Sequence, residues 1–248
     1  MIRGVIFDLG STLIRFRGKW SEVLEEGRSA MVAYLQEAGY PLDGDGFVED
    51  LKASFESNFR DRRLDHRERT TRSLVQETLS RQSVPAVAAA HLDEAMRRLY
   101  APSEACWSAV PEARATLERL RQRGYRLGLI SNASDEDNVQ RLIDSAGVRP
   151  FLDPVVISAA TGVRKPSPSL FAPVLQGWGM TAAEAVMIGD TLGEDILGAQ
   201  RAGLHQIWVQ AEADPTFNRE HAGVVIPEVT VARLEDVVPA IERLNAGA

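Results

Sequence analysis

The sequence predicts an α/β fold: a doubly wound parallel sheet with a helical segment inserted near its N-terminal end. Short, continuous apolar runs recur along the chain, and stretches of helical length separate them. Continuous apolar runs are typical of parallel strands, because such strands are buried on both faces of the sheet. Their alternation with helices indicates parallel connections. The five runs are Val5 to Phe7, Leu127 to Ile130, Val155 to Ile157, Val186 to Ile188 and Ile207 to Val209.

Helices are expected after the second, third and fourth of these runs. Pro168 lies near the start of one, and Gly147 and Gly203 follow the ends of two others, where these residue types favour helix starts and stops. After the last run we expect one weak strand and a closing helix. The expected bounds are Asp135 to Ala146, Ser167 to Trp178 and Glu194 to Ala202, then Val224 to Ile226 for the strand and Arg233 to Leu244 for the helix.

The stretch from Phe16 to Cys106 contains no comparable apolar run. Its apolar residues recur at helical spacing in four stretches. A helical insertion, residues 16–106, therefore divides a core domain formed by residues 1–15 and 107–248. The four expected helices are Trp20 to Ala38, Gly46 to Phe59, Thr70 to Ser80 and Ala86 to Tyr100.

Charge and cysteine content narrow the class of protein. With 28 basic and 35 acidic residues the formal net charge is −7, which disfavours nucleic acid and anionic membranes as partners. Cys106 is the only cysteine, so the chain forms no intramolecular disulfide, and a reducing compartment fits. The chain starts directly in a strand pattern, and no apolar run approaches the ~20 residues of a membrane helix. We expect a cytoplasmic protein; the sequence leaves its oligomeric state open.

Several of the predicted strands end on a polar residue, and ligands of doubly wound sheets bind at these carboxyl ends. Asp8 follows the first run and precedes the turn Leu9 to Leu13, while Ser131, Ser158 and Asp190 end later strands. Taken alone, Asp8 is explained equally well as a turn residue. Because other predicted strands also end on polar residues, a catalytic or binding role for Asp8 is favoured.

Three further segments carry groups suited to phosphate and to a metal ion. Ser131 and Asn132 offer a hydroxyl and turn amides for phosphate oxygens, although they also suit a helix cap. Lys165 stands before a helix start, where its ammonium can neutralise an acyl phosphate. Asp190, Glu194 and Asp195 place three carboxylates on one strand-to-helix turn, which favours a hard cation such as Mg²⁺.

In order along the chain, these segments resemble the four motifs of the haloacid dehalogenase superfamily: Asp8 to Thr12, Ser131-Asn132, Lys165-Pro166, and Gly189-Asp190 with Glu194-Asp195. The similarity spans nearly the whole chain and points to the subfamily with a helical cap inserted after the first motif. The resemblance implies a Rossmann-like core and a Mg²⁺-dependent hydrolase that acts on a small phosphorylated metabolite.

The resemblance also implies roles for individual residues. Asp8 would attack phosphorus and form a phosphoaspartyl intermediate that water hydrolyses. Mg²⁺ would be held by Asp8, Asp190 and the carbonyl of Gly10, and phosphoryl oxygens by Ser131, Asn132 and Lys165. The supporting residues would be Thr12, Glu194 and Asp195, the last two holding metal-bound water or Lys165.

One position departs from the family pattern. Most phosphatases of the superfamily carry a second aspartate, a general acid and base, two residues after the nucleophile, where this chain has Gly10. General acid-base catalysis contributes about 10² to 10⁴ in rate, so its loss weakens turnover. His66, Glu194 or a water molecule could replace the missing general acid.

Gly10 keeps two alternatives open. A metal-independent 2-haloacid dehalogenase also works without this aspartate, because a departing halide needs no proton; that branch, however, usually carries an aromatic residue at this position. The acidic cluster from Asp190 to Asp195 places phosphate chemistry ahead of it. The second alternative is a catalytically impaired relative that binds a metabolite or a partner protein.

The insertion is rich in arginine between residues 60 and 72. Asp61, Asp65 and Glu68 are interleaved with these arginines, so an exposed, salt-bridged segment is expected there rather than a substrate site. Arg15 and Phe16, just after the first motif, are the preferred candidates for substrate specificity. Aromatic residues of the insertion are expected in its core and not as a stacking platform: Trp20, Tyr34, Phe47, Phe55 and Phe59.

Overall fold

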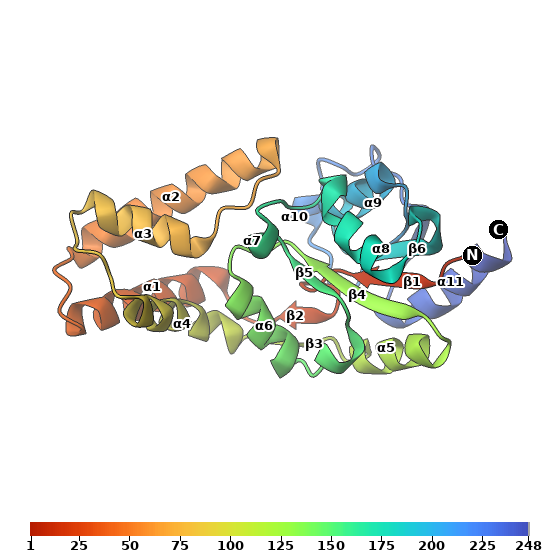
Figure 1. Ribbon diagram of the computed structural model, residues 1–248, viewed down its shortest axis with the longest axis horizontal. Helices are drawn as coiled ribbons and strands as arrows, with labels where there is room; N and C mark the ends of the chain where they lie inside the picture. Colours follow the sequence, from red (N-terminus) through yellow and green to blue (C-terminus); the bar gives the residue numbers. More distant parts are fainter. Residues whose placement is uncertain (248) are drawn as a thin grey trace.

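A computed structural model describes residues 1–247, which form a parallel sheet domain with a helical arm on one side (Figure 1). The six-stranded sheet has the order β5-β4-β1-β6-β7-β8, and every neighbouring pair is parallel. All five predicted runs form strands of this sheet, which confirms the doubly wound α/β fold. The strands are β1 (Gly4–Phe7), β4 (Arg126–Ser131), β5 (Val155–Ile157), β6 (Ala185–Gly189), β7 (His205–Val209) and β8 (Val229–Val231).

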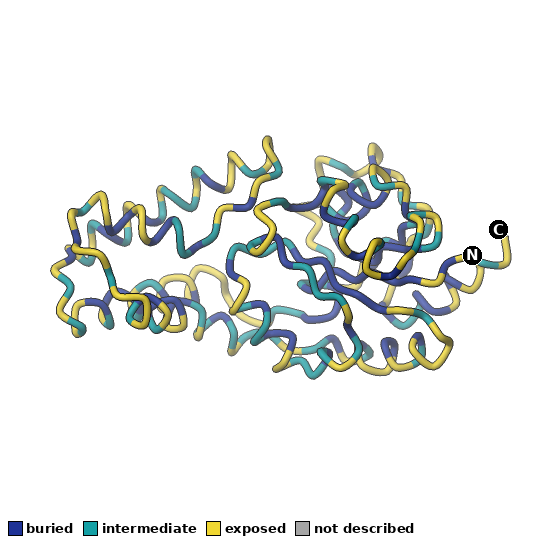
Figure 2. Tube along the Cα trace, in the orientation of Figure 1, coloured by how far each residue is buried: buried dark blue, intermediate teal, exposed yellow. Residues whose placement is uncertain are grey.

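Helices cover both faces of the sheet and bury it. On β1, Val5 and Phe7 belong to one hydrophobic cluster and Ile6 to the other, and all three side chains are fully buried. This is why the strand is apolar at every position. One face carries α5 (Ala113–Gln122), α6 (Glu136–Ser145) and α11 (Val237–Ala246), and the other carries α8 (Ala172–Trp178) and α9 (Leu197–Ala202); α7 (Ser158–Thr161) and α10 (Pro215–Asn218) are short (Figures 1 and 2).

The inserted segment folds around a hydrophobic cluster of its own, which includes Met31, Phe47 and Leu74. Gly27 lets two of its helices approach closely, since a Cβ there would lie 2.1 Å from the carbonyl oxygen of Leu99. Its four helices match the four that the sequence predicts. They are α1 (Trp20–Glu37), α2 (Gly44–Asp65), α3 (Thr71–Arg81) and α4 (Ala89–Glu104), and the antiparallel strands β2 (Ile14–Phe16) and β3 (Trp107–Ala109) join them to the sheet domain.

Three predicted elements differ from the structure. The strand expected at Val224 to Ile226 is wrong: Val224 and Ile226 are exposed, and the last strand is β8. The helix expected from Ser167 is interrupted, and α8 starts next to Pro173, where a missing N–H costs nothing. The helix expected from Glu194 begins earlier, as a π-helical turn at Leu192–Ile196 that continues into α9.

The longest helices, α1 with 18 residues and α2 with 22, both carry many charged side chains. Within residues 1–247 no helix has the length and the apolar character needed to cross a membrane.

Candidate active site

The polar residues predicted at strand ends meet at the carboxyl edge of the sheet. Asp8 follows β1, Ser131 ends β4 and Asp190 follows β6. Because β4 and β6 are the two neighbours of β1, these residues stand on three adjacent strands (Figure 1). All three residues are buried. Groups that are distant in sequence are therefore concentrated at one point, where the strand order reverses.

Lys165 lies at the centre of this group. Its Nζ atom is 2.5 Å from Asp8 Oδ1 and 2.6 Å from Asp195 Oδ1, and it donates to the carbonyl of Ile130 at 2.8 Å. Burial by itself lowers the pKa of this lysine, but the charges of Asp195 and Asp8 outweigh burial and raise the pKa above its usual value. Lys165 is thus held as a cation between two carboxylates.

The carboxylates of the site are hard to ionise together. Burial raises the pKa of Asp8, against the opposing charge of Lys165. Burial and then the charges of Asp195 and Asp8 raise the pKa of Asp190 well above its usual range. Burial raises the pKa of Asp195 to about 7. Burial is the main cause of these upward shifts and the charges of neighbouring carboxylates add to it, whereas a nearby cation opposes them.

The residues present fit a divalent cation. Asp8, Asp190 and Asp195 each offer an oxygen atom, and these atoms lie within 4.8 Å of one another. With all three ionised, the single positive charge of Lys165 leaves two negative charges uncompensated. Buried charges are normally paired or bound to metal, and carboxylate oxygens are the ligands that Mg²⁺ prefers.

A second layer of polar contacts orients Lys165 and Glu194. Asn132 accepts from the backbone N–H of Lys165 at 2.8 Å and donates to Glu194 at 2.9 Å. Arg164 also binds Glu194, at 2.9 Å. Burial raises the pKa of Glu194, but the charges of Arg164 and Lys165 outweigh this, so the net shift is downward. Glu194 is therefore held in its ionised form, which disfavours it as a proton donor.

The helical insertion reaches this layer through Glu68. Its carboxylate lies 3.0 Å from Arg164, and Ser158 donates to the same oxygen at 2.9 Å. Backbone contacts reinforce the junction: Glu68 N–H donates to the carbonyl of Gly162, and Arg164 N–H to that of His66, both at 3.0 Å. The expectation that Glu68 belongs to an exposed salt-bridged segment is wrong, because its side chain is fully buried. Neighbouring arginines do form exposed pairs: Arg63 with Glu220, Arg69 with Glu77 and Arg72 with Asp93.

Two side chains that lie outside the sequence motifs bind the backbone of the turn that carries Asp190. Trp208 donates to the carbonyl of Asp190 at 2.7 Å, and Asn218 donates to the same carbonyl at 3.0 Å. Asn218 also accepts from the N–H of Leu192 at 2.6 Å. Thr12 contacts the carboxylate of Asp190 at 3.4 Å. No motif marks Asn218, which only the fold brings to this turn.

Gly10, two residues after Asp8, leaves space for a side chain. A Cβ added there would meet one side chain within 4 Å, at 3.5 Å from Cη2 of Trp107. The glycine is therefore not required by crowding at this position. Arg15, a predicted specificity residue, lies 3.8 Å from Glu212, and Phe16 stacks on Trp20.

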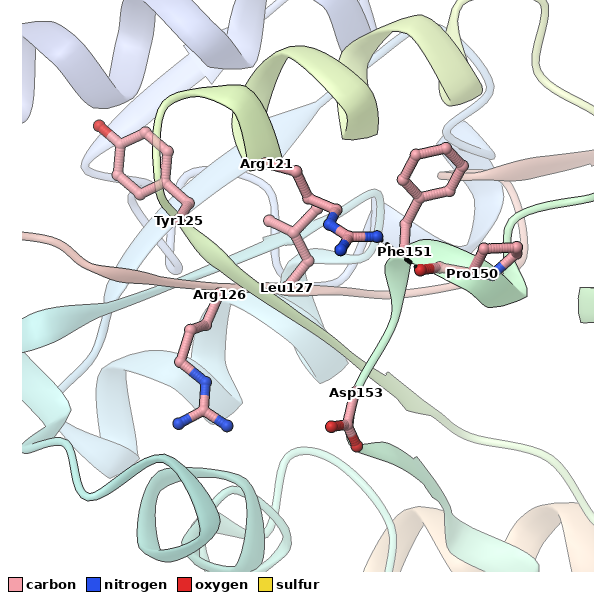
Figure 3. Close-up of a pocket in the computed structure, with 7 residues that line it drawn as sticks. All are labelled: Arg121, Tyr125, Arg126, Leu127, Pro150, Phe151 and Asp153. Carbon is pink, nitrogen blue, oxygen red and sulfur yellow. Dashed lines mark hydrogen bonds between the residues drawn. The ribbon is translucent and has the colours of Figure 1, made fainter.

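A separate hollow of about 240 Å³ lies at the opposite end of β4 (Figure 3). Its lining comes from the end of α5, the start of β4 and the segment before β5, and it includes Arg121, Arg126 and Phe151. None of the predicted chemical residues contributes to it, so it is distinct from the site at the carboxyl edge.

Comparison with known families agrees with the order of these groups. The family model described as haloacid dehalogenase-like hydrolase matches residues 2–203, which include all four sequence motifs. The chain belongs to this hydrolase family. The haloacid dehalogenase-like fold accounts for the parallel sheet and for the position of Asp8 at its carboxyl edge.

Relatives of this haloacid dehalogenase-like hydrolase include named phosphatases. The glyceraldehyde 3-phosphate phosphatase of Pyrococcus abyssi is 30% identical over 62% of this chain and 71% of its own length. The ribulose-1,5-bisphosphate 5-phosphatase of Halopiger xanaduensis is 30% identical over 90% of this chain and 91% of its own length. Among solved structures, a 2-haloacid dehalogenase from Pseudomonas syringae has a TM-score of 0.69 at 22% identity, covering 98% of this chain and 100% of its own, which shows a shared fold.

Proposed function

We propose that the chain hydrolyses the phosphate ester of a small metabolite through a phosphoaspartyl intermediate on Asp8. The observation that carries the proposal is the position of Lys165 between Asp8 and Asp195. Asp190 lies close enough to Asp8 for both carboxylates to bind one cation. Phosphoryl transfer needs positive charge around a carboxylate nucleophile, which Lys165 and a cation bound by the carboxylates would supply here. The phosphatase names of the relatives favour the same reaction.

The proposed reaction has two steps. An Asp8 carboxylate oxygen forms a bond to phosphorus while the bond from phosphorus to the ester oxygen breaks, and that oxygen leaves with the electron pair. Water then attacks the phosphorus of the phosphoaspartyl group, which releases inorganic phosphate and restores Asp8. Lys165, Ser131 and Asn132 would orient the phosphoryl oxygens throughout.

Mg²⁺ would be held by Asp8, Asp190 and the carbonyl of Gly10, and it would neutralise charge on the phosphoryl group. Asp195 would hold Lys165 in place, as its 2.6 Å contact favours. Thr12 and Glu194 would act in support of the same groups.

The glycine at position 10 limits which leaving groups the site can displace. No side chain there can protonate the departing oxygen, and the lowered pKa of Glu194 makes it a poor donor. The proton must therefore come from another donor such as His66 or water, or the oxygen must leave as a stable anion. Rates should be highest for esters of acidic leaving groups.

We infer that residues 16–106 are a cap domain over the core formed by residues 1–15 and 107–248. The cap has its own hydrophobic cluster and meets the core through the β2-β3 link and through Glu68. Such a cap would exclude bulk water from the phosphoaspartyl group and admit a substrate of limited size. A small phosphorylated metabolite fits this arrangement.

Hydrolysis of p-nitrophenyl phosphate tests the proposal. Wild type and Asp8→Asn are compared, each with Mg²⁺ and with EDTA, at matched purity. Phosphate release that needs both Asp8 and Mg²⁺ is expected. Equal inactivity of the two proteins would refute the proposal and favour an impaired, ligand-binding relative. Halide release from 2-haloacids that EDTA leaves unchanged would instead support dehalogenation.

A further inference from the structure

Three aromatic side chains form a continuous cluster next to the first motif. The Phe16 and Trp20 rings stack with centroids 3.9 Å apart and planes 8° from parallel. Trp107 meets both rings edge-on, at centroid distances of 5.4 and 5.9 Å. Phe16 and Trp107 are also cross-strand partners of the β2-β3 pair. We call Phe16, Trp20 and Trp107 the aromatic wall.

The aromatic wall lies within reach of a substrate bound at Asp8. The tip of the Trp107 ring is 3.5 Å from the position of a Cβ on Gly10. Two residues of chain span at most about 7 Å, so this ring lies within a small molecule's length of Asp8. Lys165, Asp190 and Asp195 surround Asp8 with charge, whereas the wall provides an apolar surface on the side of Gly10.

Packing of the strands β2 and β3 explains only part of this cluster. Phe16 and Trp107 are half-buried between β2, β3 and α1, as cross-strand aromatic pairs often are. Trp20, in contrast, is 47% exposed at the first position of α1, contrary to the expectation that it belongs to the core of the insertion. One face of its indole is covered by Phe16, so its remaining surface is available to a ligand.

We propose that the aromatic wall is a subsite for a planar organic group of the substrate, the group that carries the ester oxygen. The subsite rests on the proposed hydrolase function. Without a proton donor at position 10, negative charge builds up on the departing oxygen unless another donor protonates it, so esters of stable anions should react fastest. Anions that leave readily are delocalised over planar groups, as in aryl, enol and acyl phosphates, and flat groups stack well on aromatic side chains.

Binding of two phosphonates tests the subsite without turnover. Phenylphosphonate and cyclohexylphosphonate have similar size and an uncleavable bond from phosphorus to carbon, but only the first is planar. Calorimetry in the presence of Mg²⁺ should show that the wild type binds phenylphosphonate roughly twofold to tenfold more tightly, the range of an aromatic pair. Trp107→Leu should remove this preference.

Two further variants make the result specific. Trp20→Leu changes an exposed side chain and should also reduce the preference, even if Trp107→Leu disturbs the packing of β2 against β3. Phe151→Leu removes a ring from the hollow at the opposite end of the sheet (Figure 3) and should keep the preference.

The outcomes separate the subsite from the hydrolase proposal. Equal affinity of the wild type for the two phosphonates, no binding of either, or a preference that survives both tryptophan substitutions would overturn the subsite. A preference for phenylphosphonate in a protein that releases no phosphate from p-nitrophenyl phosphate would support the subsite and refute hydrolysis. Hydrolysis without the preference would refute the subsite alone.

Discussion

Glu68 and Arg164 form a buried ion pair across the junction of the helical insertion and the sheet domain, with 3.0 Å between Oε2 and Nη1. The Glu68 side chain is 0% exposed and that of Arg164 is 7% exposed. The second guanidinium nitrogen of Arg164 binds Glu194, and Lys165 is the next residue in the chain. The insertion is therefore coupled through one arginine to the groups around Asp8.

Glu68→Ala should weaken both stability and catalysis. It leaves Arg164 buried without its partner, and loss of one member of a buried pair costs about 3 to 5 kcal/mol. Urea unfolding and kcat/KM on p-nitrophenyl phosphate measure the two effects. Glu77→Ala is the matched control, because it removes an exposed pair with Arg69 worth no more than about 1 kcal/mol. Equal effects of the two variants would contradict a special role for Glu68.

Gly10→Asp should improve hydrolysis of alkyl phosphates. The position has room for a Cβ, and the new carboxyl could protonate the departing oxygen. Acid-base catalysis contributes about 10² to 10⁴ in rate, so kcat/KM should rise most for alkyl esters and least for p-nitrophenyl phosphate. Gly10→Asn adds a similar volume without the acid and should give no such gain. A gain shared equally by both variants would point to packing instead.

The sequence predicted which polar residues end neighbouring strands and so meet at the candidate site, and it missed contacts that depend on the fold. Asp8 and Asp190 follow apolar strands, so parallel topology alone brings them together. Asn218 follows no strand, and its bond to the carbonyl of Asp190 depends on the return of the chain after β7. Glu68 was misassigned because a charge among arginines is usually solvated, whereas here a core arginine neutralises it.

The secondary-structure elements, like the site residues, could be predicted from the sequence only in part. The apolar runs located the sheet because burial on both faces leaves a continuous signal. The segment Val224 to Ile226 carries the same apolar signal, but only Val225 is buried. The chain turns back on His221 there, through hydrogen bonds from the N–H groups of Val224 and Val225. The strands β2 and β3 have three residues each, too short for a periodic pattern.

Glu184→Gln should lower stability at neutral pH and have no effect in strong acid. Bonds from Thr181 and Arg3 lower the pKa of Glu184 to about 2 from 4.5. A lowered pKa in the folded state contributes stability above the unfolded pKa, and this contribution is lost as pH falls towards 2. Urea unfolding at pH 7, 5 and 3 should show the difference from wild type shrinking. Glu118→Gln, on exposed α5 surface, is the control, and a difference independent of pH would contradict the linkage.

Asn218→Ala should lower the affinity for Mg²⁺ more than it lowers the stability of the fold. Its amide donates to the carbonyl of Asp190 at 3.0 Å and accepts from Leu192 at 2.6 Å, so it fixes both sides of the turn that presents the Asp190 carboxylate. Loss of a group that orients a metal ligand typically reduces metal affinity 10- to 100-fold. Calorimetric titration of the protein with Mg²⁺, without substrate, measures this directly.

Two comparisons identify the cause of that loss. Asn218→Asp keeps an acceptor for Leu192 but removes the donor to Asp190, so its Mg²⁺ affinity should also fall. Phe217→Ser changes a neighbouring side chain that is 61% exposed and should retain wild-type affinity. If Asn218→Ala bound Mg²⁺ as tightly as Phe217→Ser, the prediction would be wrong, and the other contacts of the turn would suffice to hold it, among them the indole of Trp208, which donates to the same carbonyl at 2.7 Å.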